Sequence, residues 1–188
     1  MRKLIFSISI TLDGCCDHSK QFADDEMHDY FTGLLRESGL LVYGRTTYQL
    51  MVAFWPDAAK QQNLSRALNE FAVAFASLPI VVFSRTLDRA GGANAAANAT
   101  IVRSGLREEI LRLKQEPGKD SLTGGVSVPT QLVELGLVDE YRFVVGPVIA
   151  GAGRRLLDGA SLAESLRLKL LEVKRFQSGA VALRYAKR

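Results

Sequence analysis

The sequence contains few of the residues that usually hold metals or form disulfides. Its 188 residues include two cysteines and two histidines. The cysteines are the neighbours Cys15 and Cys16, and a vicinal pair cannot form an ordinary structural disulfide. With only His18 and His28 available, no cluster has the ligands of a zinc site. We therefore expect a reduced, intracellular protein without a metal, located in the cytoplasm.

The sequence also lacks a long apolar run and a long run of one charge. Ser9, Thr11 and Asp13 interrupt the apolar start of the chain too early for a signal peptide, and no segment approaches the length of a membrane span. The Lys and Arg residues are scattered, although the net charge is +4. We expect no membrane and no nucleic acid as partners, and anionic small molecules as ligands.

What the chain does contain is enough apolar sequence for one sizeable core. Hydrophobic residues make up 47% of it and charged residues 23%, and 188 residues would be cramped for two full domains. No repeat and no low-complexity linker divides the chain. We expect a single domain that spans residues 1–188.

Strand and helix patterns alternate over the first two thirds of the chain. Short apolar, β-rich stretches predict strands at residues 3–12, 40–43, 79–83, 100–102 and 121–123, the first three of them buried. Apolar residues at helical spacing predict helices at residues 24–38, 44–51, 61–76, 106–114 and 128–137. We expect residues 54–57 to break a helix and residues 91–99 to form a surface loop. This order predicts a largely parallel sheet with helices on its faces.

The pattern changes after residue 138. Residues 141–148 are apolar and β-rich, and residues 166–176 and 180–185 predict two strands joined near Gly179. We therefore expect an α/β fold whose sheet is mostly parallel, with an antiparallel C-terminal edge. These last strands offer more apolar surface than the helices can cover, which predicts a two-fold homodimer.

Three predicted strand ends carry residues that suit a phosphate. Gly44 and the pair Gly124 and Gly125 each stand between a strand and a helix, where a missing Cβ lets an anion approach the backbone N–H groups. One such turn is more often simple connection geometry. If the strands are parallel, their carboxyl ends open on one edge around a single cleft, and three such ends together predict a dinucleotide.

The third strand end favours a particular dinucleotide. Ser84, Arg85 and Thr86 follow residues 79–83, and Arg45 follows Gly44. Cations and hydroxyls are the groups that bind an adenosine 2′-phosphate, so this combination predicts NADPH rather than NADH.

Six motifs occur in order along the chain: residues 9–14 (SITLDG), 43–48 (YGRTTY), 82–87 (VFSRTL), 124–125 (GG), 137–141 (LVDEY) and 146–153 (GPVIAGAG). Together they resemble the dihydrofolate-reductase-like proteins, and in particular the reductase domain of the bacterial riboflavin-biosynthesis deaminase-reductase. The resemblance covers nearly the whole chain. It implies a three-layer α/β/α sandwich that binds NADPH and reduces a heterocyclic or sugar-linked substrate. Related reductase domains often pair through the C-terminal end of the sheet, which agrees with a homodimer.

The same resemblance implies roles for individual residues. The phosphates, the adenosine end and the nicotinamide side of the cofactor would be bound by three sets in turn: Gly44, Arg45, Thr46 and Thr47; Ser84, Arg85 and Thr86; and Gly124, Gly125, Val126 and Ser127. Asp13 would border the nicotinamide, and Asp29 falls near the position of the folate-binding carboxylate. Both are catalytic candidates; the alternatives are a strand-ending turn for Asp13 and a solvated helix residue for Asp29.

Two functions remain open at this point. The first is an NADPH-dependent reductase that transfers a hydride to a small pteridine-like or pyrimidine-like substrate, with true dihydrofolate reduction as a weaker variant. The second is a nucleotide-binding protein of the same fold without turnover, which the lack of a clear match to the folate-binding carboxylate would favour. The deaminase half of the riboflavin enzyme is excluded, because the chain has no His/Cys/Cys zinc signature.

Overall fold

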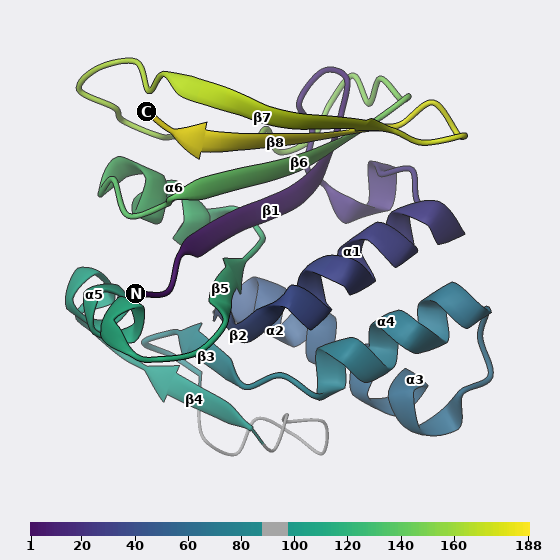
Figure 1. The fold of residues 1–188 in the computed structure, drawn as a ribbon, viewed down its shortest axis with the longest axis horizontal. Helices are drawn as coiled ribbons and strands as arrows, with labels where there is room; N and C mark the ends of the chain where they lie inside the picture. Colours follow the sequence, from purple (N-terminus) through teal and green to yellow (C-terminus); the bar gives the residue numbers. More distant parts are fainter. Residues whose placement is uncertain (88–97) are drawn as a thin grey trace. The chain divides into compact units, whose positions relative to one another are not determined.

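The computed structural model describes residues 1–87 and 98–188 (Figure 1). The described chain groups into two compact units. The first unit consists of Met1–Arg2 and Asp25–Leu122, and the second of Lys3–Asp24 and Thr123–Arg188. Each unit has strands and helices of its own.

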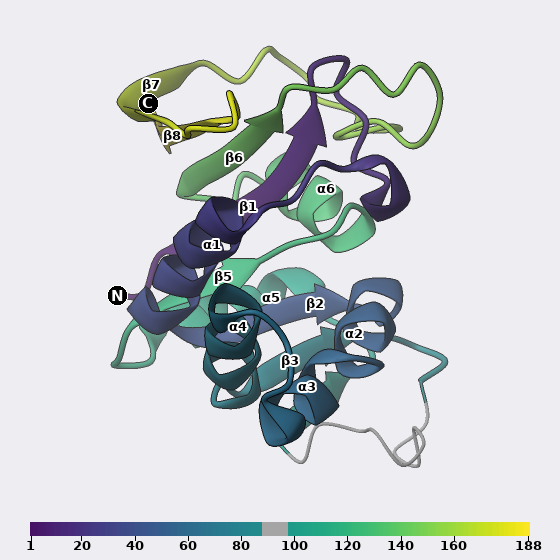
Figure 2. The ribbon, with the colours of Figure 1, turned by 90° about the vertical axis from the view of Figure 1, so that its right-hand side faces the viewer.

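The first unit alternates helices and strands. Its elements are α1 (Asp25–Glu37), β2 (Ser38–Gly44), α2 (Arg45–Val52), α3 (Trp55–Gln61), α4 (Arg66–Ala76), β3 (Ile80–Phe83), β4 (Ala99–Val102) and α5 (Leu106–Gln115), and β5 (Asp120–Thr123) runs from this unit into the second. β2 pairs with β3, and β3 with β4, in both cases in parallel. Helices α1 and α4 lie on one face of these strands and α5 on the other (Figures 1 and 2).

Strands β2 and β3 of the first unit are buried on both faces, which explains their uninterrupted apolar sequence, whereas the edge strand β4 is only partly buried. Leu41, Val42 and Val82 have no exposed surface, and Ile80 has 1%. Parallel strands covered by helices on both sides need apolar residues at every position rather than at every second one. The parallel α/β arrangement predicted for this part of the chain is therefore confirmed.

One helix was missed and another was started too early. The break predicted at residues 54–57 is confirmed, since α2 ends at Val52 and Phe54 precedes the next helix. It is shorter than predicted, because α3 begins at Trp55 and has Pro56 in its first turn, where a missing N–H leaves no hydrogen bond unmade. A second break falls at Gln62, whose φ of 54° is left-handed. α4 then begins at Arg66, after Ser65 accepts a hydrogen bond from Leu68 N. Residues 91–97 of the predicted surface loop lie outside the described residues, and Ala99 begins β4.

The second unit holds β1 (Leu4–Thr11), the short 3-10 helix η1 (His18–Lys20), α6 (Ser127–Glu134), β6 (Glu140–Gly146), β7 (Leu168–Arg175) and β8 (Val181–Lys187). The strand order within it is β1-β6-β8-β7. β1 and β6 are parallel, while β6–β8 and β7–β8 are antiparallel. The predicted antiparallel C-terminal edge is thus confirmed. α6 ends three residues before the predicted residue 137, because Gly136 turns the chain with a φ of 66°.

A buried carboxylate connects two strands of the second unit. Glu140, on β6, is 2% exposed. Its carboxylate accepts hydrogen bonds from Arg142 Nε at 2.6 Å and from Arg184 Nε at 2.8 Å, the latter on β8. These two guanidinium groups hold the pKa of Glu140 below its usual value even though burial acts to raise it. The ion-pair cluster therefore stays charged and ties β6 to β8.

Two absences hold within the described residues. No helix there is long and apolar enough to cross a membrane. In the same residues, no group of three or more His, Cys, Asp or Glu side chains is placed to hold a metal ion.

Candidate functional site

The start of α2 offers backbone donors that no side chain caps within the described chain. Gly44 ends β2 and is the N-cap of α2, and it forms no side-chain cap hydrogen bond. Arg45, Thr46 and Thr47 make up the first helical turn, whose N–H groups have no partner inside a helix. An uncapped helix start of this kind is a suitable site for a phosphate, since the N–H groups and the helix dipole both favour an anion.

The predicted residues after β3 form a compact turn. Ser84 Oγ accepts hydrogen bonds from Leu87 N at 2.9 Å and from Thr86 N at 3.3 Å. Such a hydroxyl turn fixes the backbone without help from a helix or strand. Arg85 and Thr86 are exposed at its surface.

A hydrogen bond joins this turn to the start of α2. Arg45 Nη1 donates to Thr86 Oγ1 at 2.7 Å, across 41 residues of sequence. The structure therefore brings two of the three predicted strand ends together in the first unit. Both ends come from strands that are direct neighbours in a parallel ladder.

Sequence reasoning missed Arg103 in this group. Arg103 follows β4 and donates from Nη1 to Arg85 O at 3.0 Å and from Nη2 to Leu87 O at 3.2 Å. Both bonds fix the backbone of the turn that carries Arg85. The signal was present in the sequence, because a cation directly after a parallel strand lies at the same sheet edge as the cations after its neighbours.

We call Arg45, Arg85 and Arg103 the arginine cluster. All three are exposed, and none is paired with a carboxylate of residues 1–87 or 98–188. Arg45 donates to a hydroxyl and Arg103 to two backbone carbonyls, and all three acceptors are neutral. The cluster therefore keeps a net positive charge that an anionic ligand can neutralise.

The glycine turn lies in the second unit, between β5 and α6. Gly125 has a φ of 83°, a left-handed conformation that favours glycine. The N-cap residue Val126 makes no side-chain cap hydrogen bond, and α6 begins at Ser127. The Ser127 hydroxyl lies 3.3 Å from Nη2 of Arg154. The turn thus combines an uncapped helix start with a neighbouring cation.

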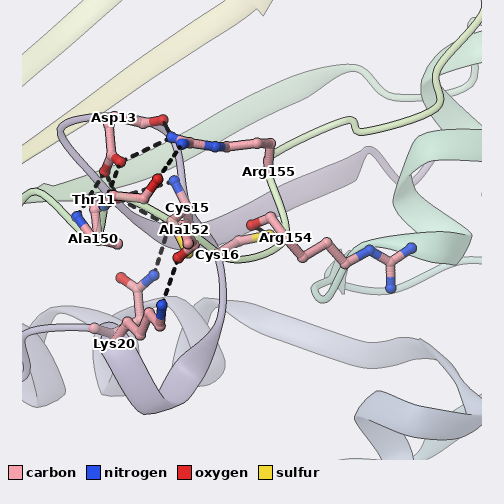
Figure 3. A network of polar contacts seen from close by, with 11 residues as sticks. Thr11, Asp13, Cys15, Cys16, Lys20, Ala150, Ala152, Arg154 and Arg155 are labelled. Carbon is pink, nitrogen blue, oxygen red and sulfur yellow. Dashed lines mark hydrogen bonds and ion pairs between the residues drawn. The ribbon is translucent and has the colours of Figure 1, made fainter.

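Asp13 lies in a dense polar network at the end of β1 (Figure 3). Its Oδ1 accepts hydrogen bonds from Thr11 Oγ1 at 2.5 Å and from Ala150 N at 3.0 Å. Its Oδ2 accepts from Gly151 N at 2.9 Å and lies 3.0 Å from Arg155 Nη1. Arg155 Nη1 also donates to the Asp13 carbonyl.

These contacts determine the charge of Asp13. The hydrogen bond from Thr11, those from the two backbone amides, and the Arg155 guanidinium together hold the pKa of the Asp13 carboxyl far below its usual value. An ionised carboxylate with both oxygens occupied can orient its neighbours, but it has no proton to donate near neutral pH.

The vicinal cysteines support the same network. Cys15 N donates to Thr11 Oγ1 at 2.9 Å, and the Cys15 side chain is fully buried. Cys16 Sγ lies 3.2 Å from Arg154 O. Burial, followed by the neighbouring Cys15, raises the pKa of the Cys16 thiol, which disfavours the reactive thiolate.

Asp29 lies on α1, where Arg66 of α4 binds it. Arg66 Nη2 is 2.7 Å from Asp29 Oδ2. The same guanidinium reaches Glu70, which is also paired with Arg36. The hydrogen bond from Arg66 lowers the pKa of Asp29. This exposed network connects α1 with α4, and no contact of Asp29 with the arginine cluster is present among the described residues.

Fold and site together define an α/β protein with a cationic, phosphate-suited strand end in its first unit. The chain matches the family model of the RibD C-terminal domain over residues 2–182, and it belongs to this family. The resemblance to dihydrofolate-reductase-like proteins, and to the riboflavin-biosynthesis reductase domain among them, is thereby confirmed.

Three similar proteins illustrate the match. YyaP of Bacillus subtilis (strain 168), which is named an uncharacterized protein, is 30% identical over 191 residues that cover 98% of this chain and 94% of YyaP. The second is a Thermotoga maritima structure, named a diaminohydroxyphosphoribosylaminopyrimidine deaminase/5-amino-6-(5-phosphoribosylamino)uracil reductase. It matches with a TM-score of 0.72 at 17% identity, and the match covers 100% of this chain and 57% of the Thermotoga maritima chain. The third is dihydrofolate reductase from Enterococcus faecalis, complexed with NADP(H). It matches with a TM-score of 0.61 at 12% identity, and the match covers 99% of this chain and 96% of the reductase chain.

Proposed function

We propose that the protein is an NADPH-dependent reductase that transfers a hydride to a small pyrimidine-like or pteridine-like substrate. The observation that carries this proposal is the arginine cluster beside the uncapped start of α2. Membership in the RibD C-terminal domain family supports a reductase. The name of the Thermotoga maritima protein and the NADP(H) in the Enterococcus faecalis reductase support the substrate class and the cofactor.

The donors in the first unit fit the anionic groups of NADPH. The N–H groups of Arg45, Thr46 and Thr47 suit a pyrophosphate, for which Gly44 leaves room. Arg45 and Arg85 suit the 2′-phosphate, and the Ser84 turn suits the adenosine end. In the second unit, we assign the backbone of Gly124, Gly125, Val126 and Ser127 to the pyrophosphate and nicotinamide side. When bound, NADPH supplies the hydride.

A titration tests the cofactor. NADPH should bind at least tenfold more tightly than NADH, because charge-assisted hydrogen bonds to a phosphate contribute about 1.5–3 kcal/mol each. Nicotinamide fluorescence with each dinucleotide measures the two dissociation constants. Equal affinities for NADPH and NADH would show that the assignment of Arg45 and Arg85 is wrong.

A second function has one observation in its favour. Hydrogen bonds from Thr11, two backbone amides and Arg155 lower the pKa of Asp13, and one from Arg66 lowers the pKa of Asp29, so neither carboxyl is ready to give a proton. This favours a nucleotide-binding protein without turnover. Following NADPH absorbance with a panel of oxidised pyrimidines and pteridines separates the two functions: tight NADPH binding without oxidation by any of them supports the second.

We also propose a homodimer through β7, one of the C-terminal strands that the sequence suggested. Of residues 141–149, which were also expected to expose apolar side chains, Tyr141 and Val144 on β6 are buried, while Ile149 is 75% exposed. Three apolar residues of β7, Leu170, Leu171 and Val173, are 44–55% exposed. A sheet edge of this kind can pair with a second copy.

Light scattering tests the dimer. The parent should be dimeric at micromolar concentration, and Val173→Asp should shift it towards monomer. Glu172→Ala, on the same strand, should leave the dimer intact and serves as the control. A monomeric parent would exclude the dimer and leave the cofactor assignment unaffected.

A further inference from the structure

Asp13 accepts more hydrogen bonds than a catalytic acid would need. Four donors from three parts of the chain meet the two carboxylate oxygens: Thr11 beside it, the amides of Ala150 and Gly151, and Arg155. Arg155 is the charged group that faces Asp13 in this network. An ionised carboxylate offers about four acceptor positions, so the network uses the capacity of Asp13 completely.

The loop at residues 150–155 is tied down on both sides of Arg154. Cys16 N donates to the Arg154 carbonyl at 2.8 Å, and Leu156 N donates to Gly14 O at 2.9 Å. Lys20 Nζ donates to Ala152 O at 2.7 Å. The backbone of Arg154 is therefore held in place by the segment that follows β1.

Close packing adds to these hydrogen bonds. Gly153 has a φ of 127°, and a Cβ at this position would lie 2.7 Å from Cys15 Sγ. The loop therefore lies directly against the buried Cys15, and a larger residue at position 153 would push it away.

The two adjacent arginines of the loop have different partners. Arg155 turns to Asp13, whereas the Arg154 side chain extends away from that pair (Figure 3). Its Nη2 donates to the hydroxyl of Ser127 at 3.3 Å. Ser127 is the first residue of α6 and follows the turn at Gly124 and Gly125. A continuous path of contacts thus runs from Asp13 through the loop to this turn.

We infer that Asp13 is a positioning residue: its carboxylate holds the loop at residues 150–155 against the end of β1, and the loop holds Arg154 on Ser127 so that the first turn of α6 keeps one conformation. The inference deepens the proposed function, since that turn is one of the segments assigned to NADPH. It gives Asp13 no proton to transfer.

A double-mutant cycle on NADPH affinity tests the path. Asp13→Asn and Ser127→Ala should each weaken NADPH binding, by about tenfold if one charge-assisted hydrogen bond is lost. Because both act on the same turn, the double variant should bind no more weakly than the weaker single variant. Ser127→Thr keeps the hydroxyl and should bind like the parent. Effects that simply add, or a Ser127→Thr variant as weak as Ser127→Ala, would overturn the inference.

A control and a pH series separate positioning from loss of charge and from proton transfer. Asp158→Asn removes a carboxylate from an exposed position close to the same loop and should change nothing. Between pH 5 and pH 8, the NADPH affinities of the parent and of Asp13→Asn should change in parallel. A pH dependence present in the parent and absent from Asp13→Asn would mean that Asp13 titrates in this range, which contradicts the inference.

Hydrogen exchange decides the same question without a cofactor. In Asp13→Asn, the amides of Ala150, Gly151 and Cys16 should exchange faster, and so should those of the first turn of α6. Faster exchange in the loop with an unchanged α6 would overturn the inference. The two proposals can also fail separately. If the parent binds neither dinucleotide, but Asp13→Asn still exchanges faster in both the loop and α6, the proposed function is refuted and the path from Asp13 to α6 is established.

Discussion

The arginine cluster of the first unit and the carboxylate-paired arginines of the second unit are held in opposite ways. In the first unit, Arg45 and Arg103 donate to a hydroxyl and to carbonyls, so their charges remain available. In the second unit, Arg155 is paired with Asp13, and Arg142 and Arg184 are paired with Glu140. An arginine bound to a neutral acceptor is therefore suited to binding a ligand, and an arginine bound to a carboxylate is suited to stabilising the fold.

This difference has an energetic reason. A guanidinium bound to a neutral acceptor keeps its net charge and attracts a phosphate, while one bound to a carboxylate has already been neutralised. Removing a paired arginine or its carboxylate should therefore reduce stability. Removing an arginine of the cluster should reduce ligand affinity and leave stability nearly unchanged.

The largest effect is expected at Glu140. Glu140→Ala would leave Arg142 and Arg184 without their buried partner and should lower the free energy of unfolding by about 3 kcal/mol. Urea unfolding measures this change. The matched control is Glu172→Ala: its carboxylate is 59% exposed and 3.7 Å from Arg184, so its loss should cost less than about 0.5 kcal/mol. Equal effects of the two variants would contradict the role of burial.

A smaller effect is expected at Gly153. Gly153→Ala would combine a left-handed φ with a Cβ against Cys15 and should destabilise the protein by about 2 kcal/mol. Gly151 has a φ of 74° but open space around it, so Gly151→Ala should cost about 1 kcal/mol. The difference between the two unfolding free energies isolates the contact with Cys15.

The arginine cluster should respond in affinity instead. Arg85→Ala should weaken NADPH binding about tenfold, equivalent to one hydrogen bond to a charged group, and should leave NADH binding unchanged. The unfolding midpoint should stay the same, because Arg85 has no ion pair within the described residues. Arg107→Ala, which removes an exposed charge of α5, is the control. A similar loss for NADPH and NADH would mean that Arg85 does not contact the 2′-phosphate.

The smallest effect is expected from pH. The pKa values of Asp13, Asp29 and Glu140 are lowered, and a carboxyl of this kind stabilises the fold above its unfolded pKa and loses that contribution as the pH falls towards its folded pKa. Their contribution to stability should therefore be constant from pH 8 to about pH 5 and decline below about pH 4.

A phosphate monoester takes up a proton near pH 6, so the preference for NADPH over NADH should fall by about threefold between pH 7.5 and pH 5.5. If the free energy of unfolding fell together with the NADPH preference between pH 7.5 and pH 5.5, the contrast between the arginine cluster and the paired arginines would be wrong.

Much of the fold follows from local patterns that sequence alone displays. The apolar runs at β2 and β3 predict buried parallel strands because a strand covered on both faces needs an apolar residue at each position. The helix at Trp55–Gln61 was missed because Pro56 is read as a breaker, although the first turn of a helix accepts it. The roles of the proposed cofactor residues and of Asp13 and Asp29 stay predictions.

By itself, the sequence determined the α/β class, the antiparallel C-terminal edge and the turns that carry glycine, serine and arginine, since periodicity and turn chemistry act over a few residues. Only the tertiary structure decided which charges are neutralised. Arg45 meets Thr86 across 41 residues, and Arg155 meets Asp13 across 142. No local pattern specifies a partner at such separations, because packing of the strands and loops brings the two side chains together.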